Sequence, residues 1–297
     1  MAESRTDRLI RSQGWLDPVG EVIQNIVGGI YGGLRGPGRG LKNLLHGTTV
    51  LGHPLHPALT DVPLGAWTVG VVADYAAYVN HAVPTQVGDF ALGLGILSAL
   101  AAALAGYTDH HDTFGHERRV ATLHGLLMTT TVLIMVISLV FRWTGGVRLH
   151  GLAVGLSTIG YLLALTGAYL GGHLTYGIGT MVNRNAFATG PDDFVTVGRD
   201  GDFREGELRK VEANGMPVLV TRVRGRLLAV ANTCSHAGGP LNEGSLDGEI
   251  VTCPWHQSEF RLSDGSVKGG PATFPLPVME VRERGGQVEV RLGQPLH

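Results

Sequence analysis

The chain has 297 residues, a length typical of two domains, and a net charge of −2 at neutral pH. A charge this close to zero gives no reason to expect a nucleic-acid partner. Only 16% of the residues are charged, against roughly 25% in average soluble proteins, and mean hydropathy is positive. The composition therefore favours a protein with membrane-spanning segments.

Residues 1–50 are predicted to form an amphipathic and loop-rich N-terminal segment. Residues 1–13 are charged and polar, without the apolar core and cleavage site of a secretory signal, so we expect no export to an oxidising compartment. Residues 14–34 (GWLDPVGEVIQNIVGGIYGGL) are amphipathic and lie next to basic residues. They are compatible with a helix on the membrane surface or with a frayed, glycine-rich lead-in. Residues 34–40 (LRGPGRG) are predicted to be a loop.

Four apolar stretches follow within a domain that we expect over residues 51–184. They cover residues 59–79, 87–107, 120–141 and 152–174. Each is close to the ~20 residues that cross a hydrocarbon core of ~30 Å. The first stretch is the weakest candidate for a membrane span because it contains Asp61 and Asp74. Buried helices of a soluble bundle are the alternative, but four stretches with so little internal charge are hard to cover with a soluble shell. We therefore predict an α-helical domain with four membrane spans.

The distribution of basic residues predicts the orientation of these spans. Four crossings put both chain ends on one side of the membrane. The segments near the membrane on that side contain Arg35, Arg39, Lys42, Arg118, Arg119 and Arg184. The other side has Arg142 and Arg148 in one short loop and no basic residue in the other loop. The positive-inside rule then predicts a multi-pass protein of the cell inner membrane with both termini in the cytoplasm.

Histidines gather at the predicted cytoplasmic ends of the spans. They are His53, His56, His110, His111, His116, His124 and His173. Ionisable residues at membrane depth are functional hypotheses by default. A haem b with two imidazole ligands needs histidines from two helices at similar depth, and His124 facing His56 or His173 would provide them. A quinone site, another metal site and simple solvation of helix ends are the alternatives. A diiron site is disfavoured because a second histidine box is missing.

The pattern changes after a linker expected at residues 185–192. Short segments of strand character, separated by Gly, Asn and Asp turns, fill residues 193–297. They cover residues 194–197, 217–223, 227–231, 249–252, 278–284 and 287–291. This spacing is typical of a small all-β sandwich or barrel. The chain is therefore predicted to be multi-domain, with a four-span α-helical membrane domain followed by an all-β domain.

The two cysteines of the chain each stand beside a histidine. The motifs are Cys234-x-His236 and Cys253-x-x-His256, and these ligand types suit iron or zinc. Zinc modules usually pair cysteine with cysteine and histidine with histidine, whereas each motif here supplies one of each. A Rieske cluster needs this mixed pairing, because one iron binds both cysteines and the other binds both histidines. The motifs therefore predict one [2Fe–2S] cluster per chain, held by these four residues.

The surrounding sequence resembles a known family. The segments ANTCSHAGGPLNEG and VTCPWHQSEFRLSDGSV are similar to the two cluster loops of Rieske ferredoxins, over roughly residues 193–293. Respiratory Rieske proteins carry an extra, disulfide-bonded cysteine in each loop, where Gly239 and Trp255 stand here. They also hydrogen-bond the cluster with a Ser and a Tyr. Ser258 matches the Ser, but Phe260 replaces the Tyr. The resemblance thus implies a ferredoxin-like cluster whose potential lies toward the lower end of the ~−150 to +300 mV Rieske range.

The membrane half resembles a second family, of uncharacterised bacterial four-helix membrane proteins. The likeness lies in GHPLHPALTDVPLGAWT, in RRVATLHGLLM and in GGHLTYGIGTMVNR, and covers roughly residues 46–184. It agrees with the four predicted spans and implies no function.

Together these features predict a membrane-anchored Rieske electron-transfer protein. It would pass single electrons between a cytoplasmic partner, such as a reductase, an oxygenase or a respiratory component, and a membrane or soluble acceptor. An oxygenase component is an alternative, although too few residues follow His256 for the iron domain of a Rieske oxygenase. A cluster-based redox sensor is another. The expected partners include the lipid bilayer and no nucleic acid, and an electron carrier or oxidoreductase subunit is favoured over a stand-alone enzyme.

Overall fold

The computed structural model describes residues 4–34, 36–48, 50–79 and 83–293. It divides into two compact units, each built from two separate segments of the chain. The helical unit comprises Met1–Gly38 and Leu55–Ile178, and the β unit comprises Arg39–Pro54 and Gly179–His297. The β unit therefore contains a short segment that precedes the long helices in sequence; we call residues 39–54 the strap.

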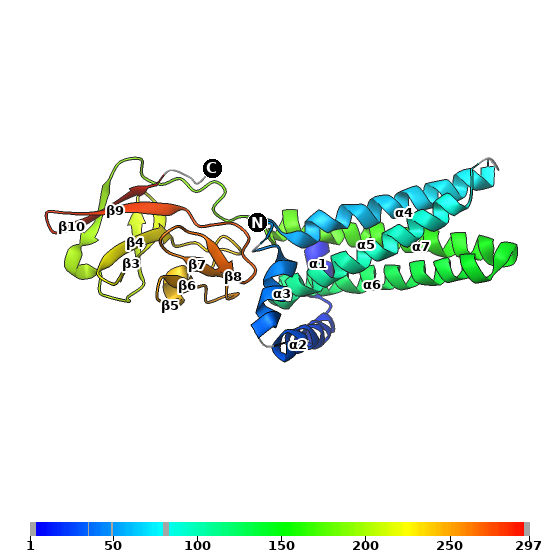
Figure 1. Cartoon of the computed structure of the whole chain (residues 1–297), viewed down its shortest axis with the longest axis horizontal. Helices are drawn as coiled ribbons and strands as arrows, with labels where there is room; N and C mark the ends of the chain where they lie inside the picture. The colour runs from blue at the N-terminus through cyan, green and yellow to red at the C-terminus, as the bar shows by residue number, and fades with distance from the viewer. Residues whose placement is uncertain (1–3, 35, 49, 80–82, 294–297) are drawn as a thin grey trace. The chain divides into compact units, whose positions relative to one another are not determined.

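Seven α-helices and one π-helical turn occur in the described residues (Figure 1). They are α1 (Arg5–Arg11), α2 (Leu16–Gly33), α3 (Gly36–His46), α4 (Leu55–Val79), α5 (Gln86–His111), α6 (Gly115–Thr144), α7 (Gly146–Gly172) and the turn His173–Ile178. The loop predicted at residues 34–40 is wrong from Gly36 onward, because α3 begins there and its proline lies in the first turn, where proline is tolerated.

The four predicted spans are confirmed as α4, α5, α6 and α7, each a few residues longer than predicted. All four are long and apolar enough to cross a membrane. They pack as two hairpins, α4 with α5 and α6 with α7. Trp67 lies fully buried in their core, and its ring occupies the space that a side chain at Gly95 would fill. Small residues allow this close approach of helices, as is usual in membranes.

One charged cluster lies inside the helical bundle. Arg142 was predicted in a loop but belongs to α6, where its guanidinium pairs in bidentate fashion with Asp74 of α4 and also contacts Asp89 of α5. Its Nη2 donates to Ser157 Oγ of α7 at 3.0 Å. The side chains of Arg142 and Asp74 are both only 1% exposed. The charge at Asp74, which weakened the first predicted span, is therefore compensated within the bundle.

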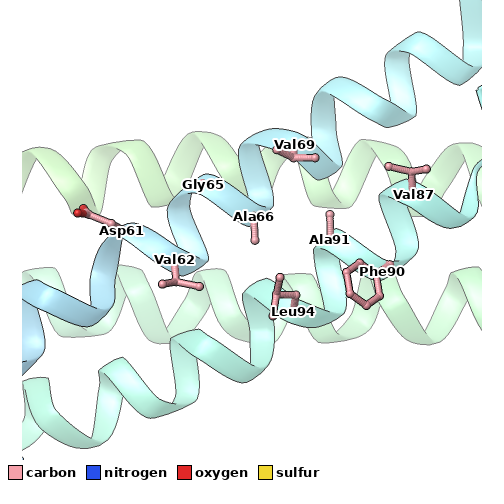
Figure 2. Close-up of a pocket in the computed structure, with 9 residues that line it drawn as sticks. All are labelled: Asp61, Val62, Gly65, Ala66, Val69, Val87, Phe90, Ala91 and Leu94. Atoms are coloured by element: carbon pink, nitrogen blue, oxygen red, sulfur yellow. The ribbon is translucent and has the colours of Figure 1, made fainter.

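A shallow groove runs between α4 and α5 (Figure 2). It measures about 400 Å³ and is lined by apolar side chains, among them Val62, Val69 and Phe90. Asp61 is the acidic residue of its lining.

The β unit contains two antiparallel sheets. The six-stranded sheet has the order β1-β10-β9-β4-β3-β2, and the four-stranded sheet has the order β5-β6-β7-β8. The strands are β1 (Val195–Arg199), β2 (Arg209–Ala213), β3 (Met216–Val223), β4 (Arg226–Ala231), β5 (Ser245–Asp247), β6 (Ile250–Thr252), β7 (Glu259–Arg261), β8 (Val267–Gly269), β9 (Val278–Arg284) and β10 (Gln287–Leu292). All six predicted strands are present. Sequence patterns missed β2, which is mostly charged, and β5, β7 and β8, which are too short to reveal an alternation.

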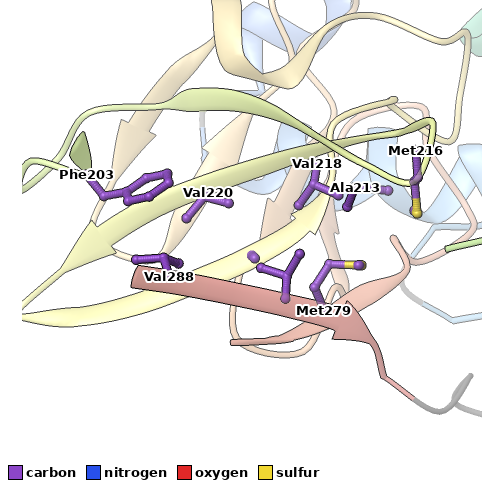
Figure 3. Close-up of a cluster of buried hydrophobic side chains, with 10 residues drawn as sticks. Phe203, Ala213, Met216, Val218, Val220, Met279 and Val288 are labelled. Atoms are coloured by element: carbon purple, nitrogen blue, oxygen red, sulfur yellow. The ribbon is translucent and has the colours of Figure 1, made fainter. Parts of the chain in front are cut away.

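Two buried clusters form the core of the β unit. In the first, alternate residues of β3, Val218 and Val220, point toward Met279 and Val288 from β9 and β10 (Figure 3). The second contains Phe260 and both cysteines, together with leucine and valine side chains. The cysteines, which belong to the loops after β4 and β6, thus lie in an apolar environment.

Candidate metal centre

The four predicted cluster ligands lie on two loops of the β unit. Cys234 and His236 follow β4, while Cys253 and His256 lie between β6 and β7. All four are buried: the exposed fractions are 1% for Cys234, 7% for His236, 0% for Cys253 and 9% for His256. The folded chain thus brings together two motifs that stand sixteen residues apart in the sequence.

The two loops share a pattern of backbone hydrogen bonds. The amide of each cysteine donates to the carbonyl five residues later, Cys234 to Gly239 at 2.9 Å and Cys253 to Ser258 at 2.8 Å. Each cysteine carbonyl accepts from the residue four positions later, which has a left-handed backbone: φ is 83° at Gly238 and 60° at Gln257. Glycine is favoured there. Gln257 is therefore the strained counterpart of Gly238.

These loops bring the side chains together as like pairs. The rings of His236 and His256 have centroids 4.8 Å apart and planes 82° apart, and the Nδ1 atoms of both are buried. The two thiols hydrogen-bond each other. This bond and burial raise the pKa of Cys234 well above its usual range, and the same bond lowers the pKa of Cys253 to about 6. The two sulfur atoms therefore lie close enough to influence each other's pKa.

This arrangement fits a two-iron cluster better than a single zinc ion. Zinc sites gather three or four protein ligands around one ion. In the described part of the chain, no three His, Cys, Asp or Glu side chains are placed to hold one metal ion. A thiol pair and an imidazole pair match the two irons of a Rieske cluster, since each iron takes only two protein ligands.

Small and aromatic residues complete the surroundings of the cysteines. A Cβ added at Gly239 would lie 2.8 Å from the Sγ of Cys253, so a larger residue there would displace the thiol. Ser258 and Phe260 are both fully buried. Trp255, in contrast, is 51% exposed, and its ring centroid lies 6.4 Å from that of His256.

A third loop, residues 270–274, contacts both cluster loops. Ser235 Oγ donates to the carbonyl of Phe274 at 2.6 Å, and the amide of Ala272 donates to Ser258 Oγ at 3.1 Å. Since Ser235 adjoins Cys234 and Ser258 holds the amide of Cys253, this loop can influence the position of both cysteines.

The strap packs on this third loop. The single hydroxyl proton of Thr48 is shared between two carbonyl oxygens, that of Gly270 at 2.8 Å from Oγ1 and that of Ala272 at 3.1 Å. Asn43 Oδ1 accepts from the amide of Gly270, and the ring of His53 lies edge-on to that of Phe274. Sequence reasoning missed Asn43 and Thr48, and it noted His53 only as one of the histidines at the ends of the spans. Nothing in residues 39–54 indicates a contact with a segment more than 200 positions away.

In the helical unit, two of the three predicted haem ligands lie together. The ring centroids of His56 and His124 are 6.1 Å apart, with planes at 78°. His173 is engaged elsewhere: its Nε2 contacts Asp7 Oδ1 at 2.9 Å, and His116 Nε2 contacts the same oxygen at 2.6 Å. Hydrogen bonds from Ser4, His116 and His173 hold the pKa of the Asp7 carboxyl well below its usual range. Asp7 thereby fastens α1 to the bundle.

Two known protein families match separate parts of the chain. Residues 193–280 match the Rieske [2Fe–2S] domain family, and residues 52–184 match a family of predicted membrane proteins, DUF2231. Ferredoxin CarAc of Metapseudomonas resinovorans is 38% identical over 90 residues, which cover 30% of this chain and 84% of the relative. The ferredoxin component of biphenyl 2,3-dioxygenase from Rhodococcus jostii is 38% identical over 92 residues, covering 31% and 86%.

A solved structure is also similar. The complex of reduced oxygenase and oxidised ferredoxin in carbazole 1,9a-dioxygenase contains a chain that is 35% identical, with a TM-score of 0.32, and the match covers 34% of this chain and 94% of that chain. Most of the length of the curated ferredoxins is thus reproduced in the last third of this chain. This chain therefore belongs to the Rieske [2Fe–2S] family, as a ferredoxin-like electron carrier joined to a multi-pass DUF2231 membrane domain.

Proposed function

We propose that this protein is a membrane-anchored Rieske ferredoxin that passes single electrons between a cytoplasmic redox protein and a membrane or soluble acceptor. The observation that carries the proposal is the separation of the ligands into a buried thiol pair and a buried imidazole pair. Cys234 and Cys253 would hold one iron, and His236 and His256 the other. The cluster, when bound, supplies a carrier of one electron at a time.

The histidine side of the cluster is the proposed site of electron exchange with the partner. His236 and His256 retain 7% and 9% exposure, whereas the cysteines retain at most 1%. The imidazoles therefore offer the shorter route to the surface. The half-exposed Trp255 stands beside His256, and tryptophan is enriched among the residues that dominate binding energies. We propose that it contacts the partner.

The proposed partner is a reductase, an oxygenase or a respiratory component. A curated relative named as the ferredoxin component of biphenyl 2,3-dioxygenase supports an oxygenase system as the soluble acceptor. A role as an oxygenase component or as a cluster-based redox sensor is the alternative. Co-purification of the full chain with an oxygenase or reductase would support electron transfer, and association with a regulatory protein would favour the sensor.

We place the protein in the cell inner membrane, with both termini and the Rieske domain in the cytoplasm. The excess of basic residues on that side supports this orientation. The internal pairing of Arg142 with Asp74 leaves still less free positive charge on the opposite side. For the membrane acceptor we propose a redox centre in the helical unit.

The cluster assignment is tested on the full chain purified in detergent. We expect two irons per chain, no zinc, and the rhombic electron paramagnetic resonance (EPR) signal of a [2Fe–2S] cluster with two imidazole ligands. Cys253→Ser and His256→Ala should abolish this signal. His150→Ala, a histidine substitution in α7 of the helical unit, should keep it. Stoichiometric zinc in the purified wild-type protein, or a signal that survives Cys253→Ser, would contradict the assignment.

A further inference from the structure

The two membrane hairpins repeat one local arrangement around a histidine. In the first hairpin, His56 of α4 hydrogen-bonds through Nδ1 to the carbonyl of Ala102 on α5, at 2.8 Å. In the second, His124 of α6 hydrogen-bonds through Nδ1 to the carbonyl of Gly167 on α7, also at 2.8 Å. Each histidine therefore reaches from the first helix of its hairpin to the backbone of the second.

A glycine follows the accepting carbonyl by four positions in both hairpins. A Cβ added at Gly106 would lie 2.7 Å from Cε1 of His56, and one added at Gly171 would lie 3.3 Å from Cε1 of His124. In an α-helix the carbonyl of residue i accepts from the amide of residue i+4. Each imidazole therefore shares its acceptor with the glycine amide, and the missing side chain gives the ring room to approach.

The sequences around the two histidines are also alike. Both read Leu-His-x-x-Leu, at residues 55–59 and at residues 123–127. This likeness, together with the repeated hydrogen bond and the repeated glycine, indicates that α4–α5 and α6–α7 are two related hairpins. The histidines are then equivalent positions of the two copies.

The hydrogen bonds determine which ring nitrogen each histidine can offer to a ligand. A backbone carbonyl only accepts, so Nδ1 of His56 and Nδ1 of His124 must both carry the proton. The neutral ring then keeps a lone pair on Nε2, the arrangement usual for metal-binding histidines whose other nitrogen is held by a carbonyl. The ring centroids are 6.1 Å apart, and an iron with bonds of about 2 Å to each ring can be held by both.

Two protein ligands favour a porphyrin over a bare metal ion. In the described residues no third His, Cys, Asp or Glu joins this pair to hold a metal ion, and two imidazoles do not satisfy a bare ion. A porphyrin supplies the remaining nitrogens and takes two axial ligands. We infer that the repeated hairpins form a symmetrical bis-imidazole site for one haem b, with His56 and His124 as the axial ligands. The inference deepens the proposed electron-transfer function, on which it rests.

The test uses the full chain, purified in detergent from cells supplied with a haem precursor. Haem per chain is measured from the reduced-minus-oxidised optical spectrum, and the Rieske cluster is measured by EPR on the same samples. We expect His56→Ala and His124→Ala each to lower bound haem at least tenfold and to leave the Rieske signal intact. His150→Ala and His173→Ala are the matched controls, and both should retain haem.

Two further variants separate ligation from folding. Gly106→Val should crowd His56 and lower bound haem, whereas His124→Met offers a replacement ligand and should retain haem with a shifted spectrum. Wild-type protein without haem, or haem retained in both alanine variants, would overturn the inference while an intact Rieske signal leaves the proposed function standing. Haem binding without any Rieske signal would overturn the proposed function and leave the haem site standing.

Discussion

Phe260 occupies a position from which a side chain can alter the cluster potential. It is fully buried in the same core as Cys234 and Cys253, and it stands where the resemblance to respiratory Rieske proteins implies a tyrosine. Hydrogen bonds to the cluster stabilise its reduced, more negative state and raise the potential. We expect Phe260→Tyr to raise the midpoint potential measured by protein-film voltammetry.

A second buried phenylalanine provides the control for this substitution. Phe203 belongs to the other core cluster of the same unit, so Phe203→Tyr adds a hydroxyl to a core without cysteines and should leave the potential unchanged. An equal rise in both variants, or a fall in Phe260→Tyr, would show that Phe260 does not lie where a tyrosine hydroxyl reaches the cluster.

Sequence reasoning could identify residues whose role depends on positions close to them in the chain. The spacing of Cys234 and His236 predicts a ligand pair because both residues lie on one loop. The repeated hydrogen bonds of that loop also explain Gln257, which has the left-handed conformation of Gly238. Asp7 could not be found in this way: its role depends on His116 and His173, each more than 100 positions away, and no local pattern encodes such a contact.

At the scale of elements, the strap is expected to stabilise the surroundings of the cluster. Thr48→Val keeps the shape of the side chain but removes its hydrogen bonds to Gly270 and Ala272. One hydrogen bond contributes about 0.5–1.5 kcal/mol, so we expect Thr48→Val to lose its cluster faster on heating, as measured by visible absorbance. Because Ala272 holds Ser258, the midpoint potential should also fall.

The hydroxyl alone accounts for this effect if Thr48→Ser restores both properties. Thr196→Val, at an exposed position of β1, is the matched control and should behave as wild type. Unchanged cluster stability and potential in Thr48→Val would mean that the strap merely covers the third loop.

The four spans were predictable as elements, but their connection through Arg142 was not. Hydropathy finds each helix separately, and the partners of a charged residue become visible only when Asp74, Asp89 and Ser157 come together. Removing one partner of a buried ion pair costs about 3–5 kcal/mol. We therefore expect Asp74→Asn to lower the thermal stability of the detergent-solubilised protein sharply.

An acidic residue of the same helix separates this effect from a general loss of charge. Asp61 lies exposed in the groove between α4 and α5 (Figure 2), so Asp61→Asn should have little effect on the midpoint of thermal unfolding. Similar destabilisation by both variants would argue that the pair with Arg142 contributes nothing specific.

At the scale of the whole molecule, the proposed orientation can be mapped with single cysteines. Both native cysteines are buried, so an introduced cysteine at an exposed position is labelled selectively. In intact spheroplasts an impermeant maleimide should label Thr85→Cys, between α4 and α5. Gln13→Cys and Gly201→Cys should react only after the membrane is broken, and the opposite pattern would invert the orientation.

The presence of the strap in the β unit makes a demand on biogenesis. Residues 39–54 leave the ribosome before all four spans, and residues 179–297 leave it after them, yet both segments build one folded unit. They can meet only if the helices between them cross the bilayer an even number of times. If one span failed to insert, the strap and residues 179–297 would lie on opposite sides of the membrane. The third loop would then lack its contacts with Thr48 and Asn43. The complete set of contacts around the cluster site therefore depends on correct insertion of all four spans.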